Sequence, residues 1–312
     1  MKRAATRPSR RTALALGTGG LVALGLGSTG EAFARTADGL PSDTAGDPSA
    51  TRRLRELEQR HAARLGVYAR NLATGRTVVH RAQELFPICS VFKPLAAAAV
   101  LRDLDREGEH LARRIHYTEA EVEASGYAPV TKEHLATGMT VGELCAAAVS
   151  QSDNLAGNLL LRELGGPTAV TRFCRSLGDR VTRLDRWEPE LNSAEPWRTT
   201  DTTSPRAVAG TYARLVLGDA LLRRDRERLT GWLLANTTNT QRFKKGLPGW
   251  TLADKTGGGD AYGVANDVGV VWSPAGDPVV MAVLTTKPDT PKGPNDSELV
   301  ANTARTLAEA LT

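Results

Sequence analysis

A serine and a lysine stand three residues apart inside an otherwise apolar stretch, LFPICSVFKPLAAAAVL, which covers residues 85–101. Burying the amine of Lys93 is costly unless its charge is paired or lost. Three positions along a helix turn by about 60° and rise by about 4.5 Å, so Ser90 and Lys93 share one face. An amine beside a hydroxyl can take its proton, and the amide at a helix start can bind an oxyanion. The pair therefore predicts that Ser90 is a nucleophile. A capped helix followed by a surface lysine would have the same pattern.

Two further polar motifs interrupt the apolar pattern later in the chain. Ser152-Asp153-Asn154 falls between two helical patterns, and these residue types also cap helices. Lys255-Thr256-Gly257 closes a strand pattern and is followed by more glycine, which lets a ligand approach the backbone closely. Each motif alone has an ordinary structural explanation. The three motifs in this order are much rarer, and they predict one site assembled from three separate elements.

The elements that must bring these motifs together are strands at the two ends of the chain and helices between them. Strand patterns cover 65–71, 77–81, 250–256, 265–272 and 279–286, and helical patterns cover 51–64, 92–105, 140–150, 154–164, 206–217 and 297–311. Tight hairpins favour antiparallel pairing. We therefore predict an α/β (α+β) fold with one antiparallel five-stranded sheet built from both termini and flanked by helices. An all-helical inserted lobe meets this sheet, and the active site lies in the cleft between them.

The N-terminal segment predicts export rather than a part of the fold. A basic start precedes an apolar run over 13–26 and then Ala32-Phe33-Ala34, which is typical of a cleavable signal peptide over residues 1–34. Arg10-Arg11 favours the twin-arginine route over a general leader with a chance arginine pair. We expect a secreted protein without stable membrane association, because the apolar run is too short for a confident span.

The chain after this segment divides into a short tail and one domain. Residues 35–51 are polar and rich in Gly, Ser, Asp and Pro, which predicts a flexible tail. Residues 52–312 are expected to form a single catalytic domain. Its α/β lobe would cover about 52–85 and 236–312, and its all-α lobe would cover about 86–235.

Charge and composition exclude several classes of partner. The chain carries 40 Lys and Arg against 35 Asp and Glu, and residues 1–34 hold five of the former and one of the latter. The remaining 35 basic and 34 acidic residues nearly balance and form no basic stripe with interleaved aromatics, so we expect no nucleic-acid partner. The five histidines are scattered without ligand spacing, which predicts no metal site, and no cofactor is expected. The three cysteines have no spacing that demands a disulfide, and we expect free thiols.

The three motifs together resemble those of the class A serine β-lactamases, a branch of the penicillin-recognising serine enzymes. The spacing agrees, with 62 residues from Ser90 to Ser152 and 103 from Ser152 to Lys255. A fourth motif, RWEPELN over 186–192, is similar to the omega loop of class A enzymes, which the related transpeptidases lack. The resemblance covers roughly residues 54–311. It implies hydrolysis of the β-lactam ring of penicillins and cephalosporins by a monomeric enzyme.

The resemblance also implies catalytic roles. Ser90 would attack the β-lactam carbonyl, and its proton would leave through Lys93 or through Glu188 and a water. The backbone N–H groups of Ser90 and Gly258 would form the oxyanion hole. Ser152 would pass a proton to the departing ring nitrogen. Glu188 would then activate the water that hydrolyses the acyl-enzyme.

A second group of residues is implied to hold the substrate and the water. Asn192 would help to hold the hydrolytic water, and an ion pair between Arg186 and Asp201 would close the omega loop. Tyr127 would border the entrance and stack on the substrate. The substrate-binding residues implied by the resemblance are Asn154, Asn192, Lys255, Thr256, Gly257, Gly258, Tyr127 and Arg242.

Two positions depart from the family pattern, and a third, Cys89, matches a position that varies within the family. Relative to the usual family stretch, one residue is added near 259–261, where it would alter access for cephalosporins. Ala265 stands where many relatives have an arginine, and Arg242 matches the position from which some actinobacterial-type members supply an equivalent guanidinium. Cys89 has no partner in the Lys-Thr-Gly strand, because Gly259 occupies the position that is cysteine in some relatives.

Two alternatives share part of this pattern. A D-alanyl-D-alanine peptidase or transpeptidase would use the same nucleophile and lysines, but it would not need Glu188 and Asn192. A non-hydrolytic penicillin-binding sensor would be acylated without turnover. Persistence of the acyl adduct separates both alternatives from a β-lactamase.

Overall fold

The computed structural model describes residues 48–312, so the predicted signal peptide and residues 35–47 of the predicted tail lie outside the described residues. Helix α1 spans Pro48–Arg60, whereas the sequence predicted a helix over 51–64. The last four residues of the predicted tail are therefore helical, which corrects that boundary. Ala50 is buried with Leu54 and Leu57, so the apolar stripe of this helix begins one turn earlier than predicted.

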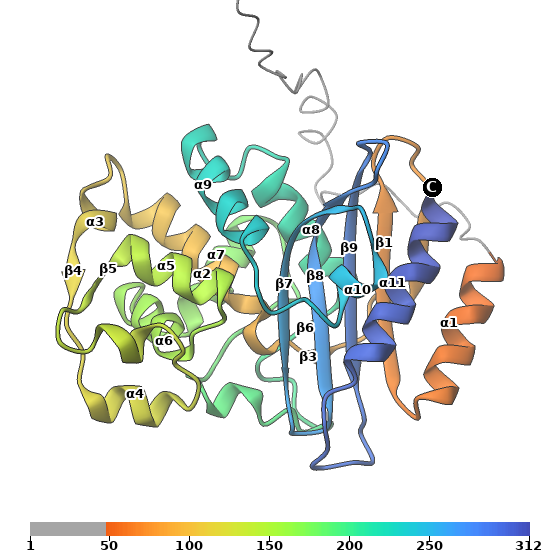
Figure 1. The fold of residues 1–312 in the computed structure, drawn as a ribbon, viewed down its shortest axis with the longest axis horizontal. Helices are drawn as coiled ribbons and strands as arrows, with labels where there is room; N and C mark the ends of the chain where they lie inside the picture. The colour runs from red at the N-terminus through yellow and green to blue at the C-terminus, as the bar shows by residue number, and fades with distance from the viewer. Residues whose placement is uncertain (1–47) are drawn as a thin grey trace, which may run out of the picture.

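The predicted five-stranded antiparallel sheet is confirmed within residues 48–312, with the order β2-β1-β9-β8-β7 (Figure 1). Its N-terminal strand β1 pairs with the last strand β9, from Arg64 opposite Thr286 to Asn71 opposite Val279. Strand β7 continues three residues beyond the predicted end at Thr256, because Gly257–Gly259 still pair with β8. The strands are β1 (Arg64–Asn71), β2 (Thr77–His80), β7 (Thr251–Gly259), β8 (Val264–Trp272) and β9 (Pro278–Thr286).

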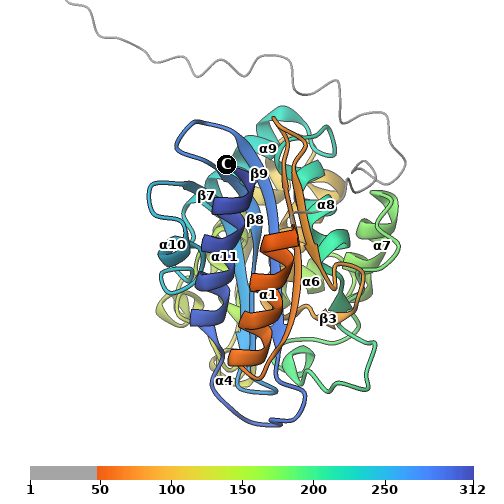
Figure 2. The same ribbon diagram turned by 90° about the vertical axis from the view of Figure 1, so that its right-hand side faces the viewer.

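Both faces of the sheet are covered, which explains why its strands are apolar at successive positions. On β9, Val279, Met281 and Val283 belong to a core shared with α1 and α11 (Ser297–Leu311). The alternate residues Val280 and Ala282 belong to the larger core that contains the other helices. Figure 2 shows α1 and α11 side by side over one face of the sheet.

The helical region is built around the short helix α2 (Lys93–Ala99), whose alanines are all buried. Their small side chains let α5 (Val141–Ser150), α6 (Asn154–Glu163), α7 (Thr168–Ser176) and α9 (Arg223–Leu234) pack against it. The helix predicted over 92–105 is divided into three segments. A 3₁₀ turn, η2 (Cys89–Phe92), precedes α2, and a π-helical segment, η3 (Val100–Leu104), follows it.

The predicted inserted lobe is mostly helical, but within the described residues it also contains two short strand pairs. Strand β3 (Phe86–Pro87) pairs with β6 (Thr202–Thr203), and β4 (Arg114–Ile115) pairs with β5 (Met139–Thr140). Helix α8 (Pro205–Val216) falls inside the predicted range 86–235 and yet packs on β1, β8 and β9. The remaining segments are α3 (Glu109–Ala112), α4 (Glu119–Ser125), η4 (Thr131–His134), η5 (Glu190–Asn192) and α10 (Phe243–Gly246).

No helix between residues 48 and 312 is both long enough and apolar enough to cross a membrane.

Candidate active site

Ser90 and Lys93 lie where the 3₁₀ turn η2 becomes helix α2. Cys89, the residue before the serine, has a left-handed backbone with φ of 44°. Lys93 Nζ lies 3.0 Å from Ser90 Oγ and donates a hydrogen bond to it. The lysine side chain is 0% exposed, so it does not reach solvent as a surface lysine would. The predicted pairing of amine and hydroxyl is present.

The buried amine of Lys93 is surrounded by oxygen atoms from three other elements. It donates to the Ser152 carbonyl at 2.8 Å and to Asn154 Oδ1 at 2.7 Å, and it lies 3.1 Å from Glu188 Oε1. Burial lowers the pKa of Lys93, and the negative charge of Glu188 partly opposes this effect. The amine can therefore exchange a proton with its neighbours more readily than an exposed lysine can.

Glu188 faces the nucleophile from the loop that precedes η5. Its Oε1 accepts a hydrogen bond from Ser90 Oγ at 3.4 Å, and its Oε2 accepts one from the Asn192 amide. The backbone of Glu188 is clamped by Asn158 on α6, which accepts from its N–H and donates to its carbonyl, both at 2.9 Å. Sequence reasoning missed Asn158. The available signal was an amide one helical turn after Asn154 on an otherwise apolar helix.

The Ser152 motif forms the turn between α5 and α6, as predicted. Ser152 adopts a left-handed backbone with φ of 60°, and its carbonyl faces Lys93. Asp153 caps α6 by accepting from the Ala156 N–H, and it also accepts from the N–H and hydroxyl of Thr131. The capping interpretation of this motif is therefore correct for Asp153, and the cap holds Ser152 in place.

Lys255 approaches the same serine from strand β7. Its Nζ donates to Ser152 Oγ at 3.0 Å and to the Thr256 carbonyl at 2.7 Å. In the part of the chain that is described, no carboxylate lies within ion-pairing distance of this amine. Burial and the nearby charges of Lys93 and Arg242 lower the pKa of Lys255 well below its usual range. The site thus contains a buried amine that forms no direct ion pair within the described residues.

Two glycines allow β7 to lie against the turn that carries Ser90. A Cβ at Gly257 would come within 2.9 Å of a Val91 methyl group. A Cβ at Gly258 would come within 2.4 Å of the Val264 carbonyl oxygen. Any larger residue at either position would displace the strand from the nucleophile or from its neighbour β8.

Arg242 lies beneath this end of the sheet and is buried, so it is not a solvated helix-end charge. Its Nη1 donates to the Gly257 and Asn266 carbonyls, both at 2.7 Å, and its Nε donates to Ser297 Oγ at 3.1 Å. Its Nη2 faces Gly258, where an added Cβ would lie 3.2 Å away. The guanidinium therefore supports β7 and retains one nitrogen that these contacts do not use.

Tyr127 and Asn154 lie together on the helical side of the site. The Asn154 N–H donates to the Tyr127 carbonyl at 2.7 Å, and its side-chain amide donates to the Ser125 carbonyl at 2.9 Å. The Tyr127 side chain is 52% exposed, which suits a residue at an entrance. The Asn154 amide carries a second N–H that none of these contacts uses.

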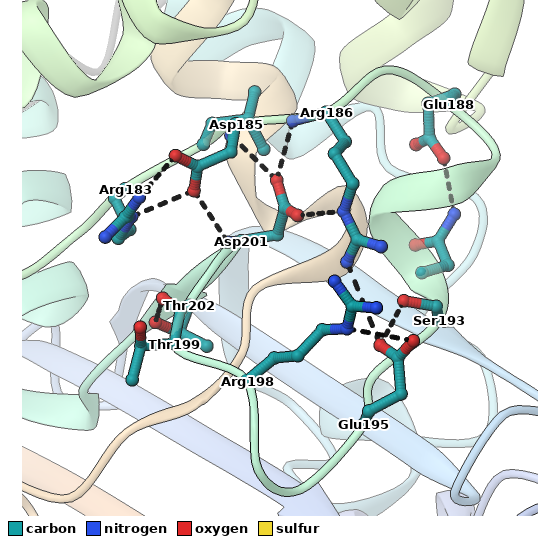
Figure 3. A network of polar contacts seen from close by, with 12 residues as sticks. Arg183, Asp185, Arg186, Glu188, Ser193, Glu195, Arg198, Thr199, Asp201 and Thr202 are labelled. Carbon is teal, nitrogen blue, oxygen red and sulfur yellow. Dashed lines mark hydrogen bonds and ion pairs between the residues drawn. The ribbon is translucent and has the colours of Figure 1, made fainter.

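The segment that carries Glu188 is closed by a polar network (Figure 3). The expected ion pair is present, with Arg186 Nε 2.6 Å from Asp201 Oδ2. The other Asp201 oxygen accepts from the N–H groups of Asp185 and Arg186. Glu195 pairs with Arg198 at 3.1 Å on the outer part of the loop. These contacts fix the two ends of the loop against each other.

Two hollows border this loop. One, of about 540 Å³, lies between α4, α6 and residues 185–190. The other, of about 520 Å³, lies behind residues 194–202 and reaches Arg64 and Glu84. Leu191 of this loop is buried in the main core, so apolar packing and the polar network together hold Glu188 in position.

The turn between β7 and β8, where the sequence predicts an added residue, packs on the same loop. Tyr262 meets Trp197 edge to face, with ring centroids 6.3 Å apart, and it also packs near Cys89. All three cysteines lie in the described part of the chain, and each thiol is free and buried. Burial raises the pKa of Cys89 to about 12, so this thiol stays protonated beside the nucleophile.

The assembled groups suit nucleophilic acyl transfer. A hydroxyl lies within hydrogen-bond distance of an amine and a carboxylate, either of which can take its proton. A second hydroxyl, that of Ser152, lies between the two buried amines. A carboxylate held from behind can activate water against the resulting ester.

Comparisons with known proteins agree with this chemistry. A profile of the β-lactamase enzyme family matches residues 49–311. A β-lactamase from Streptomyces lavendulae is 66% identical over 311 residues, which cover 98% of this chain and 98% of that protein. A β-lactamase from Streptomyces cellulosae is 60% identical over 312 residues, which cover 100% of this chain and 99% of that protein.

Solved structures give the same assignment. The β-lactamase from Streptomyces albus G is 63% identical and superposes with a TM-score of 0.83, covering 85% of this chain and 100% of that one. An ancestral class A β-lactamase, described as the last common ancestor of Gram-negative bacteria, is 47% identical with a TM-score of 0.77. It covers 84% of this chain and 98% of its own. The chain therefore belongs to the β-lactamase enzyme family, as a class A serine β-lactamase.

Proposed function

We propose that this β-lactam hydrolase works through an acyl-enzyme on Ser90. Ser90 Oγ attacks the β-lactam carbonyl, and two acceptors lie within reach of its proton. Lys93 Nζ is 3.0 Å away and Glu188 Oε1 is 3.4 Å away. The N–H groups of Ser90 and Gly258 bind the developing oxyanion. The single observation that carries the proposal is the joint contact of Lys93 and Glu188 with one buried serine hydroxyl.

Ring opening requires a proton at the departing nitrogen, and we assign its delivery to Ser152. Its hydroxyl lies 3.5 Å from Lys93 Nζ and 3.0 Å from Lys255 Nζ. The C–N bond breaks as the Ser152 proton moves to nitrogen. The proton taken from Ser90 can then reprotonate Ser152 through the Lys93 amine.

Hydrolysis of the ester is assigned to Glu188. Its carboxylate would take a proton from a water that Asn192 helps to hold, and the hydroxide would attack the ester carbonyl. The backbone clamp by Asn158 supports this role, because it fixes the direction of the carboxylate. The proton returns to Ser90 as the acid product leaves.

The remaining site residues are assigned to substrate binding. Lys255 and Thr256 would bind the substrate carboxylate, with Gly257 and Gly258 giving the strand edge room for the ring. The absence of a direct ion pair to Lys255 within the described residues supports this assignment. The other assigned residues are Asn154 for the acylamino group, Tyr127 for stacking at the entrance and Arg242 for the carboxylate side of the site.

The test follows hydrolysis of benzylpenicillin and of a chromogenic cephalosporin by the wild type, Glu188→Ala and Ser90→Ala. Intact mass is taken at seconds and at minutes. We expect many turnovers for the wild type, a persistent adduct for Glu188→Ala and no adduct for Ser90→Ala. A wild type that makes one burst and retains its adduct would instead be a peptidase, a transpeptidase or a penicillin sensor.

We also propose that residues 1–34 direct export by the twin-arginine route and that the released protein, residues 35–312, is a secreted monomer. The basic start, Arg10-Arg11 and Ala32-Phe33-Ala34 support the export signal. Replacing both arginines with lysine should retain the precursor in the cell, whereas a general leader would still be processed. Sedimentation of the secreted protein tests the monomer.

A further inference from the structure

Three polar side chains beneath the substrate edge share one face of the sheet. Thr256 on β7 lies opposite Asp267 on β8, and Asp254 is two residues before Thr256 on the same strand. Because side chains alternate along a strand and cross-strand partners share a face, all three point to the same side. Both carboxyl groups are fully buried.

The two carboxyl groups are not equivalent. Both oxygens of Asp254 accept from amides, Oδ2 from Asn236 at 3.1 Å and Oδ1 from Asn239 at 2.7 Å. Asp267 Oδ2 accepts from the Phe243 N–H at 3.1 Å, and the Asp267 side chain also forms a hydrogen bond with the Asp254 side chain. Burial and the charge of Asp254 raise the pKa of Asp267 well above its usual range. Burial also raises the pKa of Asp254, so Asp267 is the member of the pair that holds a proton more readily.

Contacts at both ends fix the direction of the Asn236 side chain. Its NH₂ group faces the Asp254 carboxylate, so its oxygen faces the other way. That oxygen accepts from the backbone N–H of Thr238 at 2.9 Å. Because a backbone N–H can only donate, the amide cannot be reversed without losing both contacts.

The fixed amide in turn fixes two hydroxyl groups. Thr238 Oγ1 lies 2.8 Å from Asn236 Oδ1, and two oxygens at that distance need a hydrogen between them. The only available hydrogen is that of the Thr238 hydroxyl. Thr238 Oγ1 also contacts Thr256 Oγ1, and its single hydrogen is already used. The hydrogen in this second contact therefore comes from Thr256.

We infer that Thr238 is a specificity-determining residue. In the free site Thr238 Oγ1 accepts the hydrogen bond that the Thr256 hydroxyl donates. A substrate carboxylate must accept that hydrogen bond in place of Thr238 in order to bind. The free site thus offers the carboxylate the buried Lys255 amine and a threonine whose hydrogen points away from it. Binding breaks the contact between the two threonines and leaves a lone pair of Thr238 without a donor. This inference rests on the proposed role of Thr256 in binding the carboxylate.

Removing the Thr238 hydroxyl should release the Thr256 hydrogen without changing the shape of the site. Thr238→Val is isosteric, and Thr238→Ser keeps the hydroxyl as the matched control. We expect Thr238→Val to raise kcat/KM for benzylpenicillin by roughly two- to tenfold through a lower KM, which is the value of one neutral hydrogen bond. The methyl ester of benzylpenicillin has no carboxylate anion, and its kcat/KM should not change. Thr238→Ser should keep the wild-type ratio of kcat/KM for the acid to kcat/KM for the ester.

A second background removes the group on which Thr238 acts. In the Thr256→Val variant, the further change Thr238→Val should have no effect on the ratio of kcat/KM for benzylpenicillin to kcat/KM for its methyl ester. Thr238→Ala, together with a thermal melt of every variant, controls for a fold that does not tolerate valine. Equal losses for acid and ester, or an effect that persists in the Thr256→Val background, would overturn the inference. A wild type that does not turn over benzylpenicillin would refute the proposed function instead.

Discussion

The two buried lysines of the site differ in what surrounds them. Lys93 is ringed by acceptors and has a carboxylate 3.1 Å away, whereas Lys255 has only the Ser152 hydroxyl and the Thr256 carbonyl. Burial lowers the pKa of both amines. For Lys93 the neighbouring charge of Glu188 opposes that effect, and for Lys255 the neighbouring cations reinforce it.

The difference indicates two uses for one residue type. Lys93 has its counter-charge built in, so its proton can move among fixed partners without any charge entering the site. Lys255 forms no direct ion pair within the described residues, so an anionic substrate that pairs with it is bound more tightly. Four predictions test this contrast.

The largest effect is expected at Lys93. Lys93→Arg keeps a positive charge but cannot give up a proton, and Lys93→Ala removes both. If proton transfer is the role of Lys93, both variants should lose about a thousandfold or more in kcat/KM. Stopped-flow acylation by a chromogenic cephalosporin measures this loss. Activity retained by Lys93→Arg would mean that only the charge of Lys93 matters, and the contrast would fail.

At Lys255, unlike Lys93, the arginine variant should keep most of the activity while the alanine variant loses it. Lys255→Ala should lose about a hundredfold in kcat/KM for benzylpenicillin, mainly through KM, because the carboxylate loses a buried, charge-assisted partner. Lys255→Arg should stay within about tenfold of the wild type, since it keeps the charge. Steady-state kinetics separate KM from kcat. Equal loss in the two variants would show that Lys255, like Lys93, acts through its proton.

Asn158 tests whether Glu188, the carboxylate that pairs with Lys93, must be held in a fixed direction. Asn158→Ala removes both hydrogen bonds that clamp the Glu188 backbone, so the direction of the carboxylate is no longer fixed. We expect kcat to fall by about tenfold while the acylation burst is nearly unchanged. Intact mass during turnover should then show an accumulating acyl adduct. A slower burst without an adduct would assign Asn158 to acylation.

Asp267, on the strand beside Lys255, is tested through the free energy of unfolding and not through a reaction rate. The folded protein holds a proton on Asp267 that the unfolded chain releases above about pH 4. The free energy of unfolding should therefore fall as the pH rises from about 4 towards the raised pKa, by at most about 1.4 kcal/mol per pH unit. Asp267→Asn cannot titrate and should lose this slope, which denaturant titrations at several pH values measure.

The exposed Asp289 supplies a matched control for this measurement. Asp289→Asn removes the same charge from the surface and should keep the wild-type slope. A slope that is the same in Asp267→Asn and in the wild type would mean that Asp267 is ionised in the folded protein.

Much of the site was predictable because its motifs obey local rules. Ser90 and Lys93 are related by helical spacing, and the Ser152 turn is marked by the capping preference of Asp153. Strand boundaries followed the apolar pattern wherever side chains were apolar. The pattern failed at Gly257–Gly259, where the strand continues through backbone pairing and the sequence has no side chain to report it.

The rest depends on contacts between segments that are far apart in sequence. Asn158 acts on a loop thirty residues away, and Asn236 acts on Asp254 across eighteen. An asparagine that clamps a catalytic backbone has the same local pattern as one that faces solvent. The strands β3 and β6 have two residues each, and they are extended because they pair with each other, which no local pattern predicts.

The pairing of β1 with β9 has a consequence for how the chain reaches this structure. Asn71 meets Val279, so roughly 200 residues must be looped out before the central ladder of the sheet can form. Closing a loop of that length costs about 5 kcal/mol of chain entropy before any contact offsets it. During synthesis, the strand that β1 needs emerges from the ribosome almost last, after every helix of the inserted region. The sheet is therefore expected to be completed slowly and only after translation ends, with β1 unpaired on the β9 side for most of that time.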